Sequence, residues 1–294
     1  FTFDVLHAPS IVTELLAPDA GVGDYFGASV DLRDQWAVVG ANLADINGEA
    51  DAGAAYLFEV EANASSDYKT KVLASTPEAN AEFGRSVAVD HPWLIVGAPK
   101  TDANGLADSG SAYLYKIESN GSVTLVEGLL PQNADQQANA LFGHSVAIDG
   151  NHILIGAPGD VISGEAFLFV IDSAGYPGDG VSVVPDDSLS GDEFGFSVSI
   201  SGTTLAVGAP GSDNAQGASY IFDLAANGDI SQAGKITRGE NASNSDRVGQ
   251  SVAVHEQSLL SGAPKATSKD GSSGGLYLET SLSEYSVPQA TNER

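Results

Sequence analysis

The chain has 294 residues, and its 39 Asp and Glu residues outnumber its 12 Lys and Arg residues, which gives a formal net charge of −27 at pH 7. This excess of negative charge makes nucleic acids and anionic membranes poor partners, because phosphate groups are bound by basic side chains. The absence of cysteine excludes disulfide bonds, and membrane insertion is not expected because no apolar run approaches the roughly 20 residues of a spanning helix.

Residues 1–23 precede the first full repeat and contain two strand-like pieces, Phe1–Val5 and Ile11–Leu16. The second piece resembles the last strand of a later unit, Val123–Val126. A last strand that arrives before any first strand has no partner nearby in the sequence. We therefore predict that it closes a ring by pairing beside residues 275–280, which removes exposed strand edges.

From residue 24 onward the chain repeats one pattern of strands. A Phe-Gly pair precedes an alternation such as Ser86–Val89, which predicts a strand with two unlike faces. An apolar run such as Leu94–Val96 then predicts a strand covered on both faces. Gly-Ala-Pro ends that strand, because proline cannot extend a central ladder, and its glycine predicts a close approach by a neighbouring repeat. The copies begin at Phe26, Phe83, Phe142, Phe194 and Val248 and end at Asn42, Pro99, Pro158, Pro210 and Pro264.

Each unit continues with a third strand that carries a central aromatic residue, and with a weaker fourth strand. Because the aromatic residue recurs at one place in the repeat, we expect it to pack between repeats rather than to bind a sugar. These residues are Tyr56, Tyr113, Phe167, Tyr220 and Tyr277. Four short strands and their turns fill a period of 52–59 residues, the size of one propeller blade.

The sequence therefore predicts an all-β fold, a β-propeller of four-stranded antiparallel blades in a single domain over residues 1–294. The repeats run at about 24–80, 81–139, 140–191, 192–245 and 246–280, with residues 281–294 as a tail. This division predicts five blades. A sixth, built from Phe1–Val5 and Glu284–Val287, is the alternative.

The five copies resemble the FG-GAP repeat of integrin α-subunit propellers and of secreted bacterial proteins. The resemblance covers about residues 24–280 and departs from the pattern at Asn42 and Val248. It implies an extracellular, non-enzymatic binding or adhesion module, with a protein or glycan at a cell surface as its partner. The integrin-like calcium loop lies between the two motifs, where this chain has no room for it, so that metal site does not carry over.

Two loops after the Gly-Ala-Pro element share the pattern Asp-x-Asn-Gly-x-x-Asp. Oxygen ligands at this spacing, with a glycine at the turn, are what a Ca²⁺ loop needs. The candidate ligands are Asp45, Asn47 and Asp51 in the first loop and Asp102, Asn104 and Asp108 in the second. Asn-Gly is also the preferred turn of a plain β-hairpin, and this alternative stays open.

The loops after the second and fourth strands of a blade share one end of the ring, so we expect an acidic rim there. Its further members would be Asp24, Glu82, Asp135, Asp192, Glu193 and Asp246. We expect this rim to hold the ligand, through cations if the two loops bind Ca²⁺. The alternative is that the acidic residues only keep the protein soluble.

Two further functions compete with this interpretation. A carbohydrate-active enzyme or lectin would need two carboxylates converging in one pocket, and nothing in the sequence singles out such a pair. A structural spacer of a larger surface protein would need no ligand. The residue after Phe-Gly varies between copies, and His144 takes this place in the third copy. Such residues could line the central channel or a blade junction, and the alternative is a surface or packing role. We expect a monomer.

Overall fold

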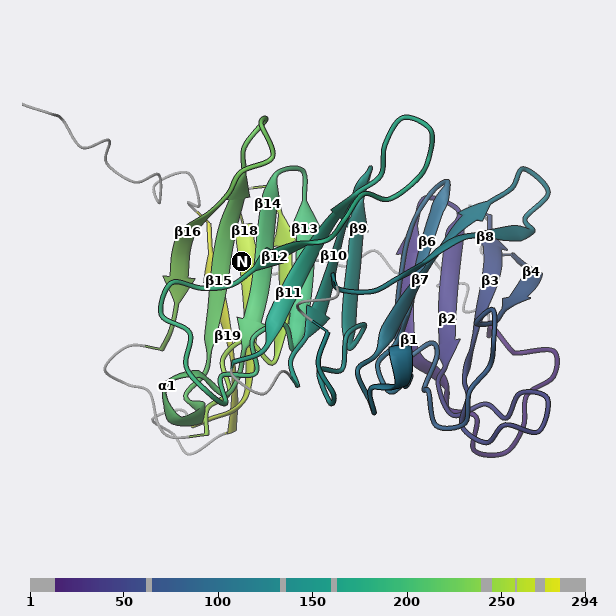
Figure 1. Cartoon of the computed structure of the whole chain (residues 1–294), viewed down its shortest axis with the longest axis horizontal. Coiled ribbons are helices and arrows are strands. Elements are labelled where there is room, and N and C mark those ends of the chain that lie inside the picture. The colour runs from purple at the N-terminus through teal and green to yellow at the C-terminus, as the bar shows by residue number, and fades with distance from the viewer. Residues whose placement is uncertain are drawn as a thin grey trace, which may run out of the picture.

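The computed structural model describes residues 14–61, 65–132, 136–159, 163–238, 245–256, 258–267 and 273–280. Their strands form five antiparallel sheets that follow one another as the blades of a propeller (Figure 1). The predicted all-β fold with five blades is confirmed. In these ranges the helical turns are η1 (Ala103–Gly105) and α1 (Ser212–Ala215), and no helix is long and apolar enough to span a membrane.

Within each blade the strands lie in chain order, and the first strand of each blade contacts the first strand of the next. Blade 1 contains β1 (Phe26–Arg33), β2 (Trp36–Ala41), β3 (Ala54–Val60) and β4 (Ser66–Val72), and blade 2 contains β5 (Ser86–Asp90), β6 (Trp93–Ala98), β7 (Ser111–Ile117) and β8 (Val123–Leu129). Blade 3 contains β9 (Ser145–Asp149), β10 (His152–Ala157), β11 (Glu165–Val170) and β12 (Val181–Val183), and blade 4 contains β13 (Ser197–Ser201), β14 (Thr204–Ala209), β15 (Ala218–Leu224) and β16 (Ile230–Ile236). Blade 5 contains β17 (Ser251–His255), β18 (Ser258–Thr267) and β19 (Ser273–Glu279).

The segment predicted to close the ring is described only from Glu14 onward, so its pairing beside residues 275–280 lies outside the described residues. Leu15 and Ala17 pack against the core of blade 1, and Asp19 accepts a hydrogen bond from the Tyr56 hydroxyl at 2.9 Å. Ala74, which follows the fourth strand of blade 1, packs in the same manner against the core shared by blades 1 and 2. The described end of the segment therefore lies where the connection from a preceding fourth strand is expected.

The repeated glycine of Gly-Ala-Pro approaches the next blade closely, as predicted. A Cβ atom on Gly97 would lie 2.0 Å from the carbonyl oxygen of Gly143 in blade 3. The Ser86 hydroxyl donates a hydrogen bond to that same carbonyl at 2.8 Å. Equivalent serine-to-glycine bonds join the other neighbouring blades in this series, from Ser29 to Gly84, Ser145 to Gly195 and Ser197 to Gly249.

The phenylalanines of the Phe-Gly pairs of blades 2 to 4 pack between neighbouring sheets. Phe142 is fully buried, and its ring centroid lies 5.5 Å from that of Phe167 and 6.1 Å from that of Phe169. Phe83 with Tyr113 and Phe194 with Tyr220 repeat this contact. The prediction that the central aromatic residues belong to the core is confirmed in blades 1 to 4, where they are at most 9% exposed.

The end of the ring opposite the Gly-Ala-Pro loops uses carboxylates to connect blades. Asp90 accepts a hydrogen bond from the Gly150 amide of the next blade at 2.6 Å, and Asp149 accepts one from the Gly202 amide at 2.6 Å. Arg33 reaches from blade 1 to both carboxylates, at 3.3 Å from Asp90 and 2.7 Å from Asp149. Part of the acidic excess is therefore structural.

The blades at the two ends of the series are less well covered than the interior ones. Val30 and Leu32 of β1 are 68% and 61% exposed, whereas Val87 and Val89 at the same places in β5 are 8% and 1% exposed. In β19, Leu278 is 62% exposed, whereas Leu114, which holds the same place in β7, is buried. The hydrophobic burial that holds blades together is thus concentrated in the interior contacts.

Candidate functional site

The loops after β2, β6, β10 and β14 form one end of the ring, which we call the loop face (the described residues are 42–53, 99–110, 158–159, 163–164 and 210–217). Each loop is hydrogen-bonded to the chain that enters the following blade. The amides of Asn80 and Phe83 donate to the carbonyls of Ala50 and Ala52 at 2.8 and 3.0 Å. Asn139 and Phe142 donate in the same way to the loop after β6, at 2.7 and 3.0 Å. The loops after the second and fourth strands therefore share one end, as predicted.

The first candidate calcium loop is built as a hairpin. Asn47 and Gly48 both have positive φ, at 56° and 94°, and Ile46 and Glu49 exchange two backbone hydrogen bonds across the turn. These values are those of the Asn-Gly turn that hairpins prefer. The Asp45 carboxylate accepts a hydrogen bond from the Asp51 amide at 3.1 Å, which ties the two ends of the motif together.

The second candidate loop repeats this tie with a different turn. Asp102 accepts a hydrogen bond from the Asp108 amide at 2.9 Å. Asn104 donates to the Gln136 side chain at 2.7 Å, so its amide is engaged with the connection into blade 3. Throughout the described ranges, no three His, Cys, Asp or Glu side chains gather closely enough to hold a metal ion. One carboxylate oxygen of Asp45 and one of Asp102 already accept a backbone amide. Calcium binding stays a prediction.

Calcium binding has a thermal readout. An ion that binds only the folded protein adds about 2.7 kcal/mol at a concentration of 100 Kd, so Ca²⁺ should raise the melting temperature by several degrees and EDTA should reverse the change. Replacing both Asp45 and Asp102 by asparagine should abolish the shift. A melting temperature that is the same with Ca²⁺ and with EDTA would remove the calcium site.

The predicted acidic rim needs correction at two members. Asp246 is fully buried and accepts a hydrogen bond from Arg238 at 2.8 Å. Asp192 is 4% exposed, accepts one from the Leu189 amide at 2.9 Å, and has a pKa raised by burial. Each lies two residues before the buried Phe194 or Val248 of a Phe-Gly or Val-Gly pair, and this short distance along the chain places the carboxylate in the interior. They are therefore packing residues and do not form part of a rim.

Two other members of the predicted rim are neutralised by nearby cations. The Oε1 atom of Glu82 lies 2.7 Å from Nζ of Lys100, and the Oε2 atom of Glu193 lies 2.6 Å from Nη2 of Arg247. Asp135 lies outside the described residues. The exposed acidic charge of the loop face therefore comes mainly from the loops themselves, where Asp45 and Asp102 are exposed. Asp213 is exposed as well, but it lies 3.2 Å from Lys235.

A cavity of about 390 Å³ opens where blades 1 to 3 converge on the loop face. Ala28, Arg85 and His144, the residues that follow Phe-Gly in these blades, all line it, so these three residues meet at a junction of blades. Buried Asn42 also lines the cavity, and its Oδ1 atom has no hydrogen-bond partner. Asn42 stands where the other copies have proline, so this departure from the repeat introduces a polar group into the wall.

The residue before each Phe-Gly or Val-Gly pair adopts a left-handed backbone conformation, which the sequence analysis did not detect. The five residues are Tyr25, Glu82, Leu141, Glu193 and Arg247, with φ between 54° and 59°. None of them is glycine, and such backbone is uncommon for other residue types. The feature of the sequence that could have indicated this conformation is that these residues hold the same position, directly before the motif, in every copy. This conformation brings the first three of them to the wall of the cavity.

His144 is partly buried in this cavity, with its ring centroid 4.8 Å from that of Phe196. Burial lowers the pKa of His144 to about 4, and the positive charge of Arg85 contributes to the shift. The unfolded chain, with a pKa near 6.5, therefore binds more protons than the folded protein between these values. The contribution of His144 to the free energy of unfolding is therefore fully present above about pH 6.5 and is lost as the pH falls toward 4.

Replacing His144 by glutamine should remove this dependence. For a pKa of about 4 against 6.5, linkage gives a loss of about 2 kcal/mol between pH 7 and pH 5 in the natural protein. The variant should lose about 2 kcal/mol less over the same interval, as measured by urea unfolding at the two pH values. The carboxylates titrate in both proteins and cancel in the comparison. Equal losses would show that His144 titrates normally.

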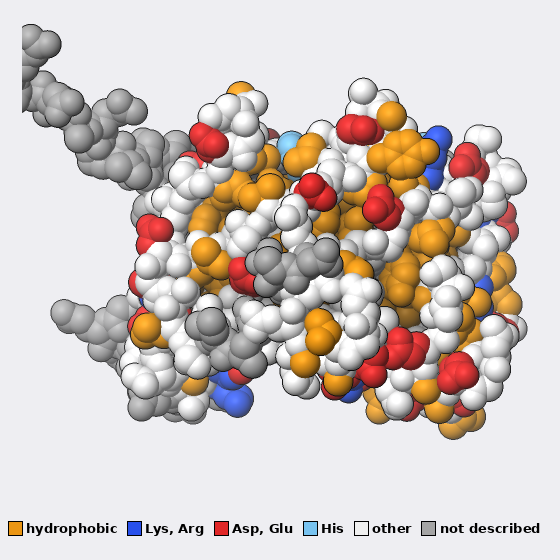
Figure 2. Space-filling view, in the orientation of Figure 1, with side chains coloured by type: hydrophobic (Ala, Val, Ile, Leu, Met, Phe, Trp, Pro, Cys, Tyr) orange, Lys and Arg blue, Asp and Glu red, His pale blue; other side chains and the backbone are white. Residues whose placement is uncertain are grey.

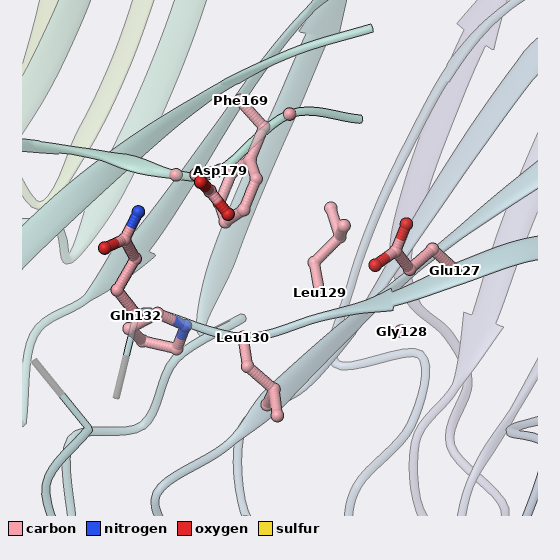
Figure 3. Close-up of a pocket in the computed structure, with 10 residues that line it drawn as sticks. Glu127, Gly128, Leu129, Leu130, Gln132, Phe169 and Asp179 are labelled. Atoms are coloured by element: carbon pink, nitrogen blue, oxygen red, sulfur yellow. The ribbon is translucent and has the colours of Figure 1, made fainter. Parts of the chain in front are cut away.

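A further cavity of about 400 Å³ lies between blades 2 and 3, beside β8 and the segment that precedes β12. Glu127 and Asp179 both line it, the pairing that the competing enzyme function requires. Figure 3 shows the two carboxylates on opposite sides of the cavity, with Leu129 between them. Carboxylates that hydrolyse a glycosidic bond must flank one bond, and an interposed leucine does not favour that arrangement.

Comparison with known proteins agrees with this architecture. A family model described as the FG-GAP repeat matches residues 10–58, 68–115, 129–169 and 179–222, which is more than half of the chain. The fifth copy, from Val248 to Pro264, lies beyond these matches. No curated protein sequence matches the chain.

Two solved structures are similar in shape. A protein from Lactobacillus plantarum matches with a TM-score of 0.51 and 12% identity, over 87% of this chain and 71% of its own. The periplasmic gluconolactonase of Pseudomonas aeruginosa matches with a TM-score of 0.48 and 13% identity, over 86% of this chain and 65% of its own. At such low identity, the likeness to the first protein shows a shared fold and nothing about function.

Proposed function

The chain belongs to the FG-GAP repeat family, and from that premise we propose that it is a non-enzymatic, extracellular binding module whose loop face holds a protein or glycan ligand in an adhesion role. The observation that carries the proposal is the backbone locking of the loop face. The amides that enter blades 2 and 3 are hydrogen-bonded to the loops after β2 and β6. Loops held on a rigid scaffold are where propeller-like folds place their binding residues.

The charges of the loop face indicate the chemistry of the ligand. Asp45 and Asp102 are exposed on neighbouring loops of this face. Two basic residues of this face, Lys100 and Arg85, are already engaged by Glu82, with nitrogen–oxygen distances of 2.7 Å and 4.0 Å. Uncompensated carboxylates on neighbouring loops favour a ligand with positive charge, or a cation that bridges to the ligand. Ca²⁺ on the two Asp-x-Asn-Gly loops would serve as such a bridge.

The experiment removes the negative charges of Asp45 and Asp102 and preserves the structure of their two loops. Asparagine retains the Oδ1 atom that accepts the amide hydrogen bond of Asp51 or Asp108, so Asp45→Asn and Asp102→Asn together should preserve both loop structures. The natural protein and the double variant are compared on an array of extracellular proteins and glycans, with and without Ca²⁺. We expect a ligand that the natural protein retains and that the variant binds about tenfold more weakly, equivalent to about 1.4 kcal/mol.

Asp67→Asn is the matched control, because the Asp67 side chain is 75% exposed on β4, away from the loop face. It should bind as the natural protein does. A ligand that binds the double variant with unchanged affinity would place the site elsewhere on the ring. Complete absence of binding would favour the structural spacer.

A further inference from the structure

The third blade departs from the repeat in the connection between its last two strands. That connection spans residues 171–180, whereas the corresponding ones in blades 2 and 4 span 118–122 and 225–229. The strand that follows it, β12, has three residues, whereas β8 and β16 each have seven. Insertions into single units of a repeat protein collect on the surface as loops, often on a binding face.

The inserted loop has a defined structure. Asp172 accepts hydrogen bonds from the amides of Ala174 and Tyr176 at 2.8 and 2.9 Å, and these bonds lower its pKa. The Asp172 amide donates in return to the Tyr176 carbonyl at 2.8 Å. Pro177 pairs with Ile171 across the base of the loop. The loop therefore holds Tyr176 in place, with 60% of its surface exposed.

This loop reaches across to blade 2 and forms one wall of a groove. A Cβ atom on Gly175 would lie 3.1 Å from the Trp93 ring, so the loop backbone rests against that indole. The cavity between them measures about 510 Å³ and is lined by Trp93, Leu125 and Tyr176 together with Lys116, Glu118 and Asp172.

The cavity described above with Glu127 and Asp179 is bordered by the same two elements, β8 and the inserted connection. On the face in Figure 2, hydrophobic side chains are exposed between acidic ones. The two cavities are lined by successive parts of β8, residues 124–126 and 127–129, and we call the pair the groove. Trp93 and Tyr176 line the first cavity, and carboxylates line both.

We propose that this groove binds a neutral oligosaccharide. The aromatic rings of Trp93 and Tyr176 offer flat apolar surfaces to the carbon–hydrogen faces of sugar rings. Lys116, Glu118 and the carboxylates of the second cavity supply donors and acceptors for hydroxyl groups. Acidic sugars are disfavoured because the protein carries a net charge of −27. This site is separate from the loop face and does not depend on the function proposed for it.

A proline-rich peptide is the other ligand that an aromatic groove accommodates. The composition of the lining favours the sugar. Beside its aromatic residues the groove presents carboxylates, an ammonium group and the Gln132 amide, which are groups that pair with the many hydroxyls of a carbohydrate. A proline-rich segment has few hydrogen-bonding groups to satisfy them, because proline has no amide hydrogen.

The test uses the intrinsic fluorescence of Trp93. The chain has two tryptophans, so a Trp36→Phe background leaves Trp93 as the single reporter. This protein is titrated with maltohexaose, cellohexaose and chitohexaose, and in parallel with a decaproline peptide. We expect at least one sugar to change the Trp93 emission in a saturable manner and the peptide to leave it unchanged. Adding Tyr176→Ala should weaken that binding about tenfold, since Tyr176 is one of the two aromatic contacts.

Tyr68→Ala in the same background is the control, because Tyr68 is an exposed tyrosine of β4, at 39%, that lines neither cavity of the groove nor the cavity of the loop face. It should leave sugar binding unchanged. The proposal is overturned if no sugar changes the emission up to about 10 mM, well above the weak-binding limit of a specific site. It is also overturned if the peptide binds and the sugars do not, or if the two tyrosine variants bind the sugar equally well.

Discussion

Replacing Gly97 by alanine is expected to lower the free energy of unfolding by about 3 kcal/mol, the upper end of the cost of inserting a methyl group into a packed interior. The new Cβ atom would lie 2.0 Å from the Gly143 carbonyl oxygen of the next blade. The Ser86 side chain, 2.4 Å from the same Cβ position, can rotate away. The carbonyl is backbone, so relief requires blades 2 and 3 to separate.

Gly262→Ala is the matched control, because Gly262 ends the same motif in blade 5. Its Cβ atom would also meet a serine hydroxyl at 2.4 Å, that of Ser251, and the next nearest atoms, the Cβ and carbonyl oxygen of the same serine, lie at 3.7 Å. Urea unfolding should show a small effect, below about 1 kcal/mol, for a clash that one side chain relieves by rotation. Equal losses in the two variants would show that the Gly97 effect arises within the blade.

Replacing Phe142 by alanine should cost about 3–5 kcal/mol, the range for a large aromatic removed from a core that cannot collapse. The ring is fully buried and lies against Phe167 and Phe169 between the second and third blades. Strands hydrogen-bonded on both sides surround it, so little relaxation is available to fill the space. The change is measured as the shift in free energy from urea or thermal unfolding.

Phe26→Ala tests whether the effect depends on the interior position. Phe26 opens the same motif in blade 1, with its ring centroid 5.4 Å from that of Tyr56, but it is only partly buried. Its loss should cost less than half as much, because less apolar surface is removed from contact. Phe142→Val should fall between the two, since valine fills this position in blade 5. A cost for Phe26→Ala equal to that for Phe142→Ala would indicate that the motif, not its burial, determines stability.

The sequence predicted only part of the candidate site. It predicted that Asp45 and Asp102 share one end of the ring, because the position within a repeat determines the end of the blade. For His144 it left the central channel, a blade junction and a packing role open. It did not detect that Asp246 is buried against a cation, since a single sequence does not show which cation meets which carboxylate. The calcium motif is equally typical of the hairpin that the first loop forms.

The amino-acid sequence by itself determined the blade. The alternation after Phe-Gly, the apolar run before Gly-Ala-Pro and the period of the copies are local features, and local hydrogen bonding and side-chain alternation convert them into four-stranded sheets. It also determined that the Gly97 position must be free of a side chain, because the same glycine recurs in every copy.

The tertiary structure alone decided which surfaces meet. The contact of the inserted loop with Trp93 and the junction of three blades around His144 both join segments more than 50 residues apart in the chain. Such contacts depend on the angle at which one sheet packs on the next, and that angle results from the summed packing of many side chains. No single motif encodes it, so the groove, the cavity and the burial of Asp246 are properties of the assembled ring.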